Sequence, residues 1–344
     1  MRLSVLDLVP VRTDQTTSDA LAASTSLARV ADELGFTRYW VAEHHNMAAV
    51  AATSPPVLIA HLAAHTERIR VGSGGVMLPN HAPLAVAEQF ALLEAAHPGR
   101  IDLGIGRAPG SDPVTSIALR GAAGRDDTDV QRFPEYLDDV VALMGSDGVR
   151  VPIPRQQYVL KATPAAATEP RLWLLGSSMY SAHLAAAKGL PYVFAHHFSG
   201  EHTAEALAVY RREFAPSEAA AEPITFLTIN AVVAPTREEA VEAALPQMQL
   251  MARLRSGMPL GPLDLIEDAL ALDTSRLQPL IDDGLTRAVI GDPADAAEQI
   301  RKLAARFEVD EVMVNPIGSA HRGEDPRSAR SREQTLELTA AALL

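Results

Sequence analysis

Short apolar runs alternate with longer amphipathic segments along most of the chain. The runs are rich in β-branched side chains, and most are continuously apolar instead of alternating with polar residues. Continuous apolar runs are typical of parallel strands that are covered on both faces. We therefore expect parallel strands at 3–9, 38–45, 69–77, 101–106, 171–177, 190–197, 225–234, 287–291 and 309–315.

Helical spacing of apolar residues marks the segments between these strands. The first helix is expected from about Asp19 and should end at Gly35, where a C-terminal glycine is favoured. Ser54 followed by Pro55 is typical of an N-cap and a first helical turn. Further helices are expected at 55–66, 83–96, 181–189 and 293–307.

Alternating strands and helices leave two architectures, an open doubly wound sheet or a closed barrel. The strand candidates are spread over the whole chain without a break in composition. This favours a (β/α)8 TIM barrel, in the α/β class, that forms one domain over residues 1–344. The long connections at 108–132, 150–170 and 252–283 are interpreted as inserted loops at the C-terminal face, with their conformations left open.

Charge and composition narrow the possible partners. With 43 acidic and 30 basic residues the net charge is −13, which disfavours binding to nucleic acid or to an anionic membrane surface. The absence of cysteine excludes thiolate chemistry, iron–sulfur clusters and Cys-ligated zinc. Neither a signal peptide nor an apolar run of membrane-spanning length is evident, so we expect a cytoplasmic, soluble protein.

Polar residues and glycines gather where the predicted strands end. They are Glu43-His44-His45, Gly72–Gly75, Gly104–Arg107, Gly176–Ser181 and His196-His197. The carboxyl ends of barrel strands build the active site in enzymes of this architecture. A ligand site at this end is therefore expected.

A metal site is the first alternative, because Glu43, His44 and His45 are adjacent. Neighbouring residues on a strand face opposite sides, so the two histidines cannot both reach one ion while the strand continues. We therefore predict no metal site. A purely structural role, in packing or in capping loop backbone, is the other alternative for these histidines.

The glycines also allow more than one interpretation. Gly104 and Gly106 begin a GxG pattern, but Pro109 stands where a dinucleotide fingerprint needs its third glycine. These two glycines are also explained by crowding inside the barrel. The segment Gly176–Ser181 opens a predicted helix, where backbone N–H groups and serine hydroxyls favour a phosphate. Capping of that helix by serine is compatible with the same pattern.

Two longer stretches carry a resemblance to a known family. They are RYWVAEHHN with RIRVGSGGVMLPNHAPLAVAEQFALLEAAHPGRIDLGIGRAPGSD, and the later LGSSMYSAHLAAAKGLPYVFA. Over residues 1 to about 200 the chain closely resembles the bacterial luciferase-like family of flavin-dependent monooxygenases. The segments RAVIGDP and VMVNPIG resemble it more loosely.

The resemblance implies a cofactor site for reduced FMN across the mouth of the barrel. Ser178, Ser181 and neighbouring amides would hold its phosphate, and Arg107 would be the cationic partner. A non-prolyl cis peptide between Gly74 and Gly75 would lie under the flavin ring. The residues assigned to the cofactor are Gly74, Gly75, Arg107, Gly176, Ser177, Ser178, Tyr180 and Ser181.

The catalytic assignment rests on the same resemblance. His44 would act as general acid and base in the reaction with oxygen, and Glu43 and His45 would orient it or line the pocket.

The implied function is a two-component monooxygenase. A separate flavin reductase would supply reduced FMN, and dioxygen would oxidise a small organic substrate whose identity stays open. A homodimer is expected, through the helices at 55–66 and 83–96. The alternatives are a deazaflavin-dependent oxidoreductase and a non-catalytic flavin-binding protein.

Overall fold

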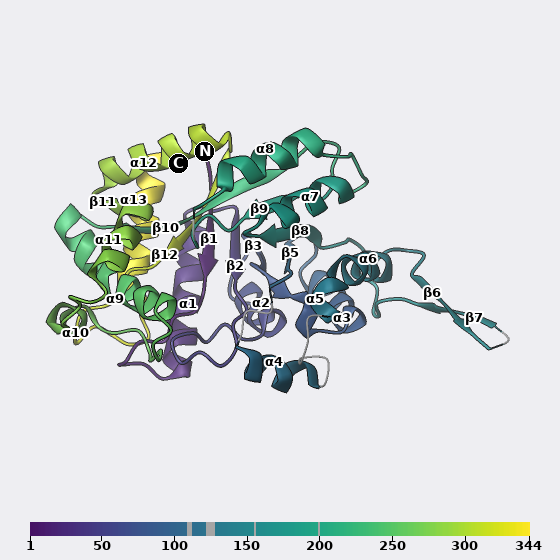
Figure 1. The fold of residues 1–344 in the computed structure, drawn as a ribbon, viewed down its shortest axis with the longest axis horizontal. Helices are drawn as coiled ribbons and strands as arrows, with labels where there is room; N and C mark the ends of the chain where they lie inside the picture. Colours follow the sequence, from purple (N-terminus) through teal and green to yellow (C-terminus); the bar gives the residue numbers. More distant parts are fainter. Residues whose placement is uncertain (109–111, 122–127, 155, 199) are drawn as a thin grey trace.

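A closed barrel of parallel strands organises the computed structural model, which describes residues 1–344 apart from 109–111, 122–127, 155 and 199 (Figure 1). Around the barrel run β10, β12, β1, β2, β3, β5, β8 and β9, and β9 pairs back with β10. This arrangement confirms the predicted (β/α)8 TIM barrel. The barrel strands are β1 (Arg2–Asp7), β2 (Arg38–Val41), β3 (Arg70–Ser73), β5 (Ile101–Gly106), β8 (Arg171–Gly176), β9 (Tyr192–Phe194), β10 (Thr225–Val233) and β12 (Glu311–Pro316).

Two further short strands extend this sheet. β4 (Val76–Met77) pairs with β5, and β11 (Val289–Gly291) pairs with the end of β10. Every segment that we expected to be a strand contains one, although several are shorter than expected. The segment 190–197, for example, contributes only Tyr192–Phe194, which frees His196 and His197 to leave the barrel wall.

Helices cover the outside of the barrel (Figure 1). The expected helix at 83–96 is α3 (Pro83–Ala96), and the expected helix at 293–307 is α12 (Pro293–Phe307), each with proline in its first turn. The other main helices are α1 (Thr17–Glu33), α2 (Pro55–Ala63), α6 (Phe133–Met144), α7 (Met179–Lys188), α8 (Thr203–Glu213), α9 (Arg237–Arg255) and α13 (Arg330–Leu343). No helix in the described part of the chain combines the length and apolar character of a membrane span.

Local signals explain where the first helices begin. Thr16 and Asp19 form a capping box that satisfies two backbone N–H groups at the start of α1. Ser54 occupies the expected N-cap position of α2, but its side chain makes no capping hydrogen bond. Proline in the first turn, which needs no N–H partner, explains why α2 begins there without one.

The connections that the sequence left open contain structure of their own. The connection at 108–132 contains α4 (Pro113–Arg120) and α5 (Thr128–Gln131). The connection at 252–283 contains α10 (Ile266–Ala271) and the start of α11 (Gln278–Arg287). A short 3-10 helix, η1 (Leu78–Asn80), follows β4. Between α6 and β8, the strands β6 (Val149–Ile153) and β7 (Gln156–Leu160) form an antiparallel hairpin. Figure 1 shows this hairpin extending well away from the barrel.

A buried ion network fills the end of the barrel at which the strands begin. Arg38 on β2 is 2% exposed; its Nε donates to Glu311 Oε1 at 2.6 Å, and its Nη1 donates to Asp102 Oδ2 at 2.8 Å. Burial lowers the pKa of Arg38, but the two carboxylates outweigh burial and the net shift is upward. Ser4 Oγ donates to Glu311, and Arg70 Nε donates to Asp102, so residues from five neighbouring strands share these contacts.

An aromatic layer lies against this network. The rings of Trp40, Trp173 and Phe226 meet edge to face at centroid distances of 5.0–5.6 Å, and the guanidinium of Arg38 lies 4.7 Å from the Trp173 ring. Leu6 packs in the same cluster, and its side chain also lines the cavity described below. The aromatic layer therefore separates the ion network from the mouth of the barrel.

Replacing Arg38 by alanine should lower the free energy of unfolding by about 3–5 kcal/mol, because two buried carboxylates lose their partner. Arg2→Ala is the matched control. Arg2 also approaches Glu311, at 3.7 Å, but its side chain is 57% exposed. Its removal should change stability by less than about 1 kcal/mol. Urea unfolding followed by tryptophan fluorescence measures both, and equal losses in the two variants would contradict the structural role given to Arg38.

Candidate active site

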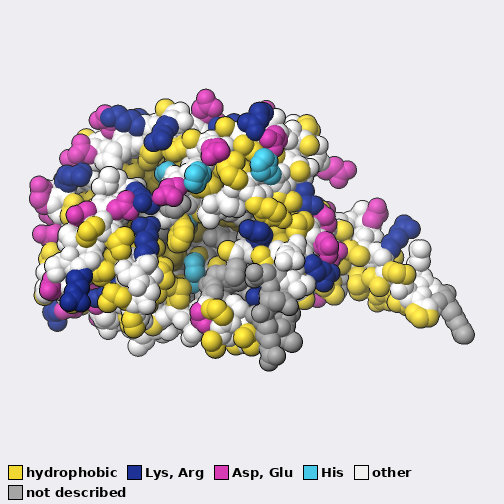
Figure 2. Space-filling view, in the orientation of Figure 1, with side chains coloured by type: hydrophobic (Ala, Val, Ile, Leu, Met, Phe, Trp, Pro, Cys, Tyr) yellow, Lys and Arg dark blue, Asp and Glu magenta, His cyan; other side chains and the backbone are white. Residues whose placement is uncertain are grey.

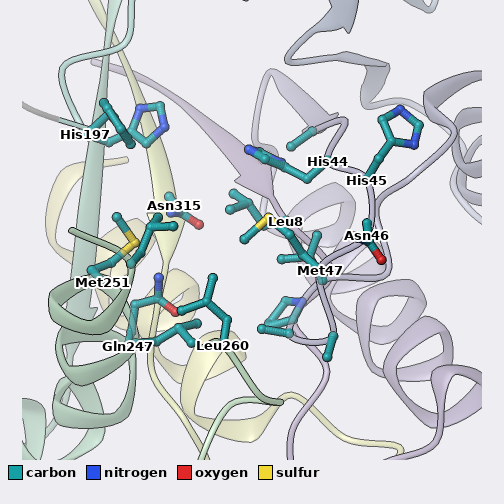
Figure 3. A pocket seen from close by; sticks show the side chains of 18 of the residues that line it. Leu8, His44, His45, Asn46, Met47, His197, Gln247, Met251, Leu260 and Asn315 are labelled. Carbon is teal, nitrogen blue, oxygen red and sulfur yellow. The ribbon is translucent and has the colours of Figure 1, made fainter. Parts of the chain in front are cut away.

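A cavity of about 750 Å³ opens at the carboxyl ends of the barrel strands. Its floor comes from residues in or just after β1, β2, β3, β9, β10 and β12, and its walls come from residues 44–50, α9 and residues 258–260. Figure 2 shows the face of the molecule hollowed in this central region. Hydrophobic side chains make up most of the walls, and polar side chains lie both on the walls, as His44 and Gln247 do, and on the floor, as His197 and Asn315 do (Figure 3).

His44 leaves the end of β2 and lines this cavity. Its backbone N–H donates to the carbonyl oxygen of Ala52 at 2.8 Å, which fixes the turn after the strand. Its Nδ1 is buried and, within the described chain, has no hydrogen-bond partner. Burial lowers the pKa of His44, and the charge of neighbouring Glu43 only partly offsets this. The imidazole is therefore mainly neutral near pH 7.

Glu43 has a different role from the one expected. Its carboxylate accepts hydrogen bonds from His45 Nε2 at 2.8 Å, His81 Nε2 at 2.7 Å and the Met77 amide at 3.0 Å. Burial raises the pKa of Glu43, but the bonds from His81 and His45 outweigh it and the pKa is lowered. Glu43 thus orients His45 and His81 instead of His44, and the expectation that it orients His44 is corrected.

His44 and His45 point in different directions, as Figure 3 shows. The ring of His45 turns toward Glu43, and only His44 is left without a polar partner. Both residues lie beyond Val41, the last residue of β2, so the loop and its hydrogen bonds set these directions. Sequence reasoning missed His81, whose only signal was its place in the stretch LPNHAP.

A second histidine faces the cavity from β9. His197 Nδ1 is buried, with no hydrogen-bond partner in the part of the chain that is described. Burial, followed by the charges of His196 and His44, lowers the pKa of His197 to about 4. In Figure 3 His197 and His44 lie on opposite sides of the cavity.

Two asparagines hold the segment that carries His197. Asn230 Nδ2 on β10 donates to the carbonyl oxygen of His197 at 2.9 Å, and Asn315 Nδ2 on β12 donates to Asn230 Oδ1 at 2.8 Å. Both asparagines also line the cavity. Sequence reasoning missed them, although each is a polar residue within an otherwise apolar strand.

Glycines allow close backbone packing beside His44. The peptide bond between Gly74 and Gly75 is cis, as the resemblance implied. A Cβ added to Gly74 would lie 2.9 Å from Leu6 Cδ1, and one added to Gly75 would lie 2.8 Å from the carbonyl oxygen of Gly104. Gly104 itself is explained by crowding, because its Cβ would collide with the Ser73 carbonyl oxygen, whereas Gly106 has open space.

The remaining predicted cofactor residues form a second group on β5, β8 and α7. Arg107 lies over the ring of Tyr180, with its guanidinium carbon 4.2 Å from the ring centroid. Among the described residues, Arg107 forms no ion pair. Ser178 is the N-cap of α7, and its side chain makes no capping bond. Its hydroxyl and the first amides of the helix therefore stay available.

Two residues of this second group, Ser181 and Gly176, pack against each other and support the loop before α7. Ser181 Oγ donates to the Ser178 carbonyl oxygen at 2.7 Å and lies 3.0 Å from the hydroxyl of Tyr192, so it is directed into the protein. A side chain at Gly176 would collide with Ser181, which explains the glycine there. The exposed Ser177 lies next to them in the loop. The second group does not line the cavity, but the Ala195 amide donates to Gly176 at 2.9 Å and so connects it to the strand end that bears His197.

Comparison with known proteins places this geometry in a family. A model of the luciferase-like monooxygenase family matches residues 1–310. The chain belongs to the luciferase-like monooxygenase family. A luciferase-like monooxygenase from Escherichia coli is 38% identical over 312 residues, which are 91% of this chain and 90% of that protein. The N-acetyl-S-alkylcysteine monooxygenase of Bacillus subtilis is 34% identical over 324 residues, which are 93% and 94%.

Solved structures of luciferase-like monooxygenases share this barrel. Apo-MsnO8 matches with a TM-score of 0.85 at 34% identity, over 99% of this chain and 98% of that one. At the level of fold alone, two more distant structures differ in cofactor. The oxygenating constituent of a Pseudomonas putida diketocamphane monooxygenase was solved with FMN (TM-score 0.71, 18% identity, coverage 100% and 99%). A secondary alcohol dehydrogenase was solved with an F420 adduct (TM-score 0.64, 16% identity, coverage 98% of each).

The residues at this end of the barrel are compatible with a flavin-type cofactor that carries a phosphate. Arg107 and the uncapped N-terminus of α7 offer a cation and amide donors. The Gly74-Gly75 step offers a flat surface, and the buried Nδ1 of His44 needs a partner that no described residue supplies.

The low pKa of His197 predicts a pH dependence of stability. In the unfolded chain a histidine has a pKa of about 6.5, so the unfolded state binds the proton more tightly. Stability should therefore fall as the pH falls from about 6.5 toward 4, and His197→Asn should reduce this loss. Urea unfolding near pH 7 and near pH 5 measures it, with His202→Asn, at a side chain 68% exposed, as control. The same loss in the wild type and in His197→Asn would contradict the burial argument.

Proposed function

We propose that this protein is an FMN-dependent two-component monooxygenase that uses reduced FMN from a separate reductase. One observation supports the proposal, namely that an arginine, a helix N-terminus without a side-chain cap and a buried histidine nitrogen without a described partner lie at the same end of the barrel. Arg107 is the arginine, α7 is the helix and His44 is the histidine. Membership of the luciferase-like monooxygenase family supports the same reaction class.

Each group of residues has a task in this function. Arg107 and the first amides of α7 bind the phosphate and so set the position of the cofactor. Gly74 and Gly75 allow a planar ring to approach the backbone closely. Bound reduced FMN supplies two electrons, with which dioxygen gives one oxygen atom to the substrate and the other to water. The hydrophobic walls of the cavity exclude bulk water while this happens.

His44 is the proposed proton-transfer residue. Because burial lowers the pKa of its imidazole, a neutral ring lines the cavity near pH 7, and its buried Nδ1 has no partner among the described residues. A neutral imidazole accepts a proton at one stage and returns it at another. A protein that only stored flavin would have no use for a desolvated, unpartnered imidazole at this position.

Cofactor choice is the first test of the proposal. Calorimetry should show tighter binding of reduced FMN than of FAD or a reduced deazaflavin. Arg107→Ala should weaken FMN binding by about 1.5–3 kcal/mol, the scale of a hydrogen bond to a charged group. Lys188→Ala, at the C-terminal end of α7 and far from its N-terminus, should leave the affinity for FMN unchanged. Tighter binding of the deazaflavin would replace the monooxygenase with a hydride-transfer enzyme.

The second test concerns His44. His44→Ala should leave FMN affinity nearly unchanged, because the phosphate site lies on other strands. Oxygen transfer to substrate should fall by about 10²–10⁴, the usual contribution of a general acid–base group. The oxygen consumed should reappear as hydrogen peroxide. His45→Ala should have a smaller effect, since His45 is turned toward Glu43. A larger loss of oxygen transfer in His45→Ala than in His44→Ala would show that the assignment to His44 is wrong.

We further propose a homodimer through α2 and α3. Val57 on α2 is 67% exposed and Leu92 on α3 is 56% exposed, so both would gain from being covered. Light scattering at micromolar concentration should give twice the mass of one chain, and Leu92→Glu should shift it toward one. Ile117→Glu, at an exposed site on α4, is the control. A wild-type monomer would refute the dimer.

A further inference from the structure

The lining of the cavity is nearly free of charge. Asp112 is the one carboxylate among its described lining residues, and none of them is lysine or arginine. His44 and His197 are mainly uncharged near pH 7 because both imidazoles are buried. His45, at the rim, already bonds to the Glu43 carboxylate.

Arg107 is assigned to the cofactor phosphate in the proposed function, and three further cations near the cavity already have carboxylate partners. Arg38 lies beneath the aromatic layer and is held between Asp102 and Glu311. At the end of α9, Arg253 Nη2 lies 3.6 Å from Asp264 Oδ2, and Arg255 Nη1 lies 3.4 Å from Asp283 Oδ2. An anionic group inside the cavity would therefore lose water without gaining a cation, which is strongly unfavourable.

The walls suit an apolar molecule of variable shape. Met47 lies on one side and Met251 on the other (Figure 3), and Met258 also lines the cavity. Methionine side chains are unbranched and adjust to irregular apolar surfaces. The volume of about 750 Å³ falls within the usual range of small-molecule pockets, about 300–1,000 Å³.

The floor offers hydrogen bonds to one polar group. His197 lines the cavity from one side and His44 from the opposite side, and the Nδ1 atom of each ring is buried without a partner in the described chain. Asn315 donates through Nδ2 to Asn230, which leaves its Oδ1 as a further acceptor at the floor. An uncharged hydroxyl, carbonyl or amide matches these side chains, because a neutral imidazole both donates and accepts hydrogen bonds.

We propose that the substrate is an uncharged, mainly apolar molecule with one hydrogen-bonding group, and that the cavity rejects carboxylates and sulfonates. This inference rests on the monooxygenase function proposed above, since it names the substrate class of the same site. It predicts that charge, more than chain length, decides which molecules enter.

Binding can be measured without flavin. The only tryptophans of the chain, Trp40 and Trp173, lie in the aromatic layer that shares Leu6 with the cavity floor. Their fluorescence should report titration with octylthiopropanamide, octylthiopropanoate and octanesulfonate. The neutral amide should bind at least about tenfold more tightly than either anion, which corresponds to about 1.4 kcal/mol.

A positive charge placed in the wall should reduce or remove the preference for the neutral amide. Gln247 projects into the cavity from α9 (Figure 3), so Gln247→Arg should strengthen binding of the carboxylate at least about tenfold. Glu242→Gln makes the same change in net charge on the exposed side of α9 and should leave all three affinities unchanged.

The outcomes separate this inference from the proposed function. Equal or tighter binding of an anion by the wild type overturns the inference, as does failure of all three probes to bind. A strengthened carboxylate affinity in Glu242→Gln also overturns it, because the selectivity would then follow net charge. Failure of reduced FMN to bind would instead overturn the proposed function, and it would leave the probe titrations unaffected.

Discussion

The guanidinium of Arg38, shared by Asp102 and Glu311, is the contact on which the inside of the barrel depends. It joins β2 to β5 on one side and to β12 on the other, and Ser4 and Arg70 add β1 and β3. A charge this deep is tolerable only when its partners are close and well oriented. The three strands must therefore keep their register for the network to form.

The rest of the site is built upward from that network. Arg38 supports the aromatic layer of Trp40, Trp173 and Phe226, and Trp40 Nε1 donates to Asp102 at 3.0 Å. Leu6 rests on this layer and forms part of the cavity floor. The ion network thus lies on one side of the aromatic layer. On the other side the strands end in the residues that line the cavity. Alternation along β2 directs Trp40 into the aromatic layer. The turn that follows β2 places His44 at the cavity.

Patterns that are local in sequence were predictable. Continuous apolar runs located the strands, and Pro83 and Pro293 marked the first turns of α3 and α12. The site at the carboxyl ends of the strands followed from the fold, and the resemblance directed attention to His44 and to the Gly74-Gly75 step. The cavity does bring these together, whereas Arg107 and Gly176–Ser181 lie beside it as a second group.

Contacts between distant segments were not predictable. Glu43 binds His81, which is 38 positions away, and Arg38 binds Glu311, which is 273 positions away. No periodicity records such pairs. The hairpin of β6 and β7 was missed for a related reason. It has no side packed on the barrel core, so its residues lack the alternation that burial of one face imposes.

The double role of Leu6 determines which residues of the cavity can be substituted without disturbing the barrel. Because the same side chain belongs to the core layer and to the cavity floor, the floor cannot be enlarged without disturbing the packing of the barrel. The walls face no such constraint, since α9 and residues 258–260 lie outside the barrel strands. Substitutions on the walls therefore change which substrate fits without the loss of stability that a substitution at Leu6 brings.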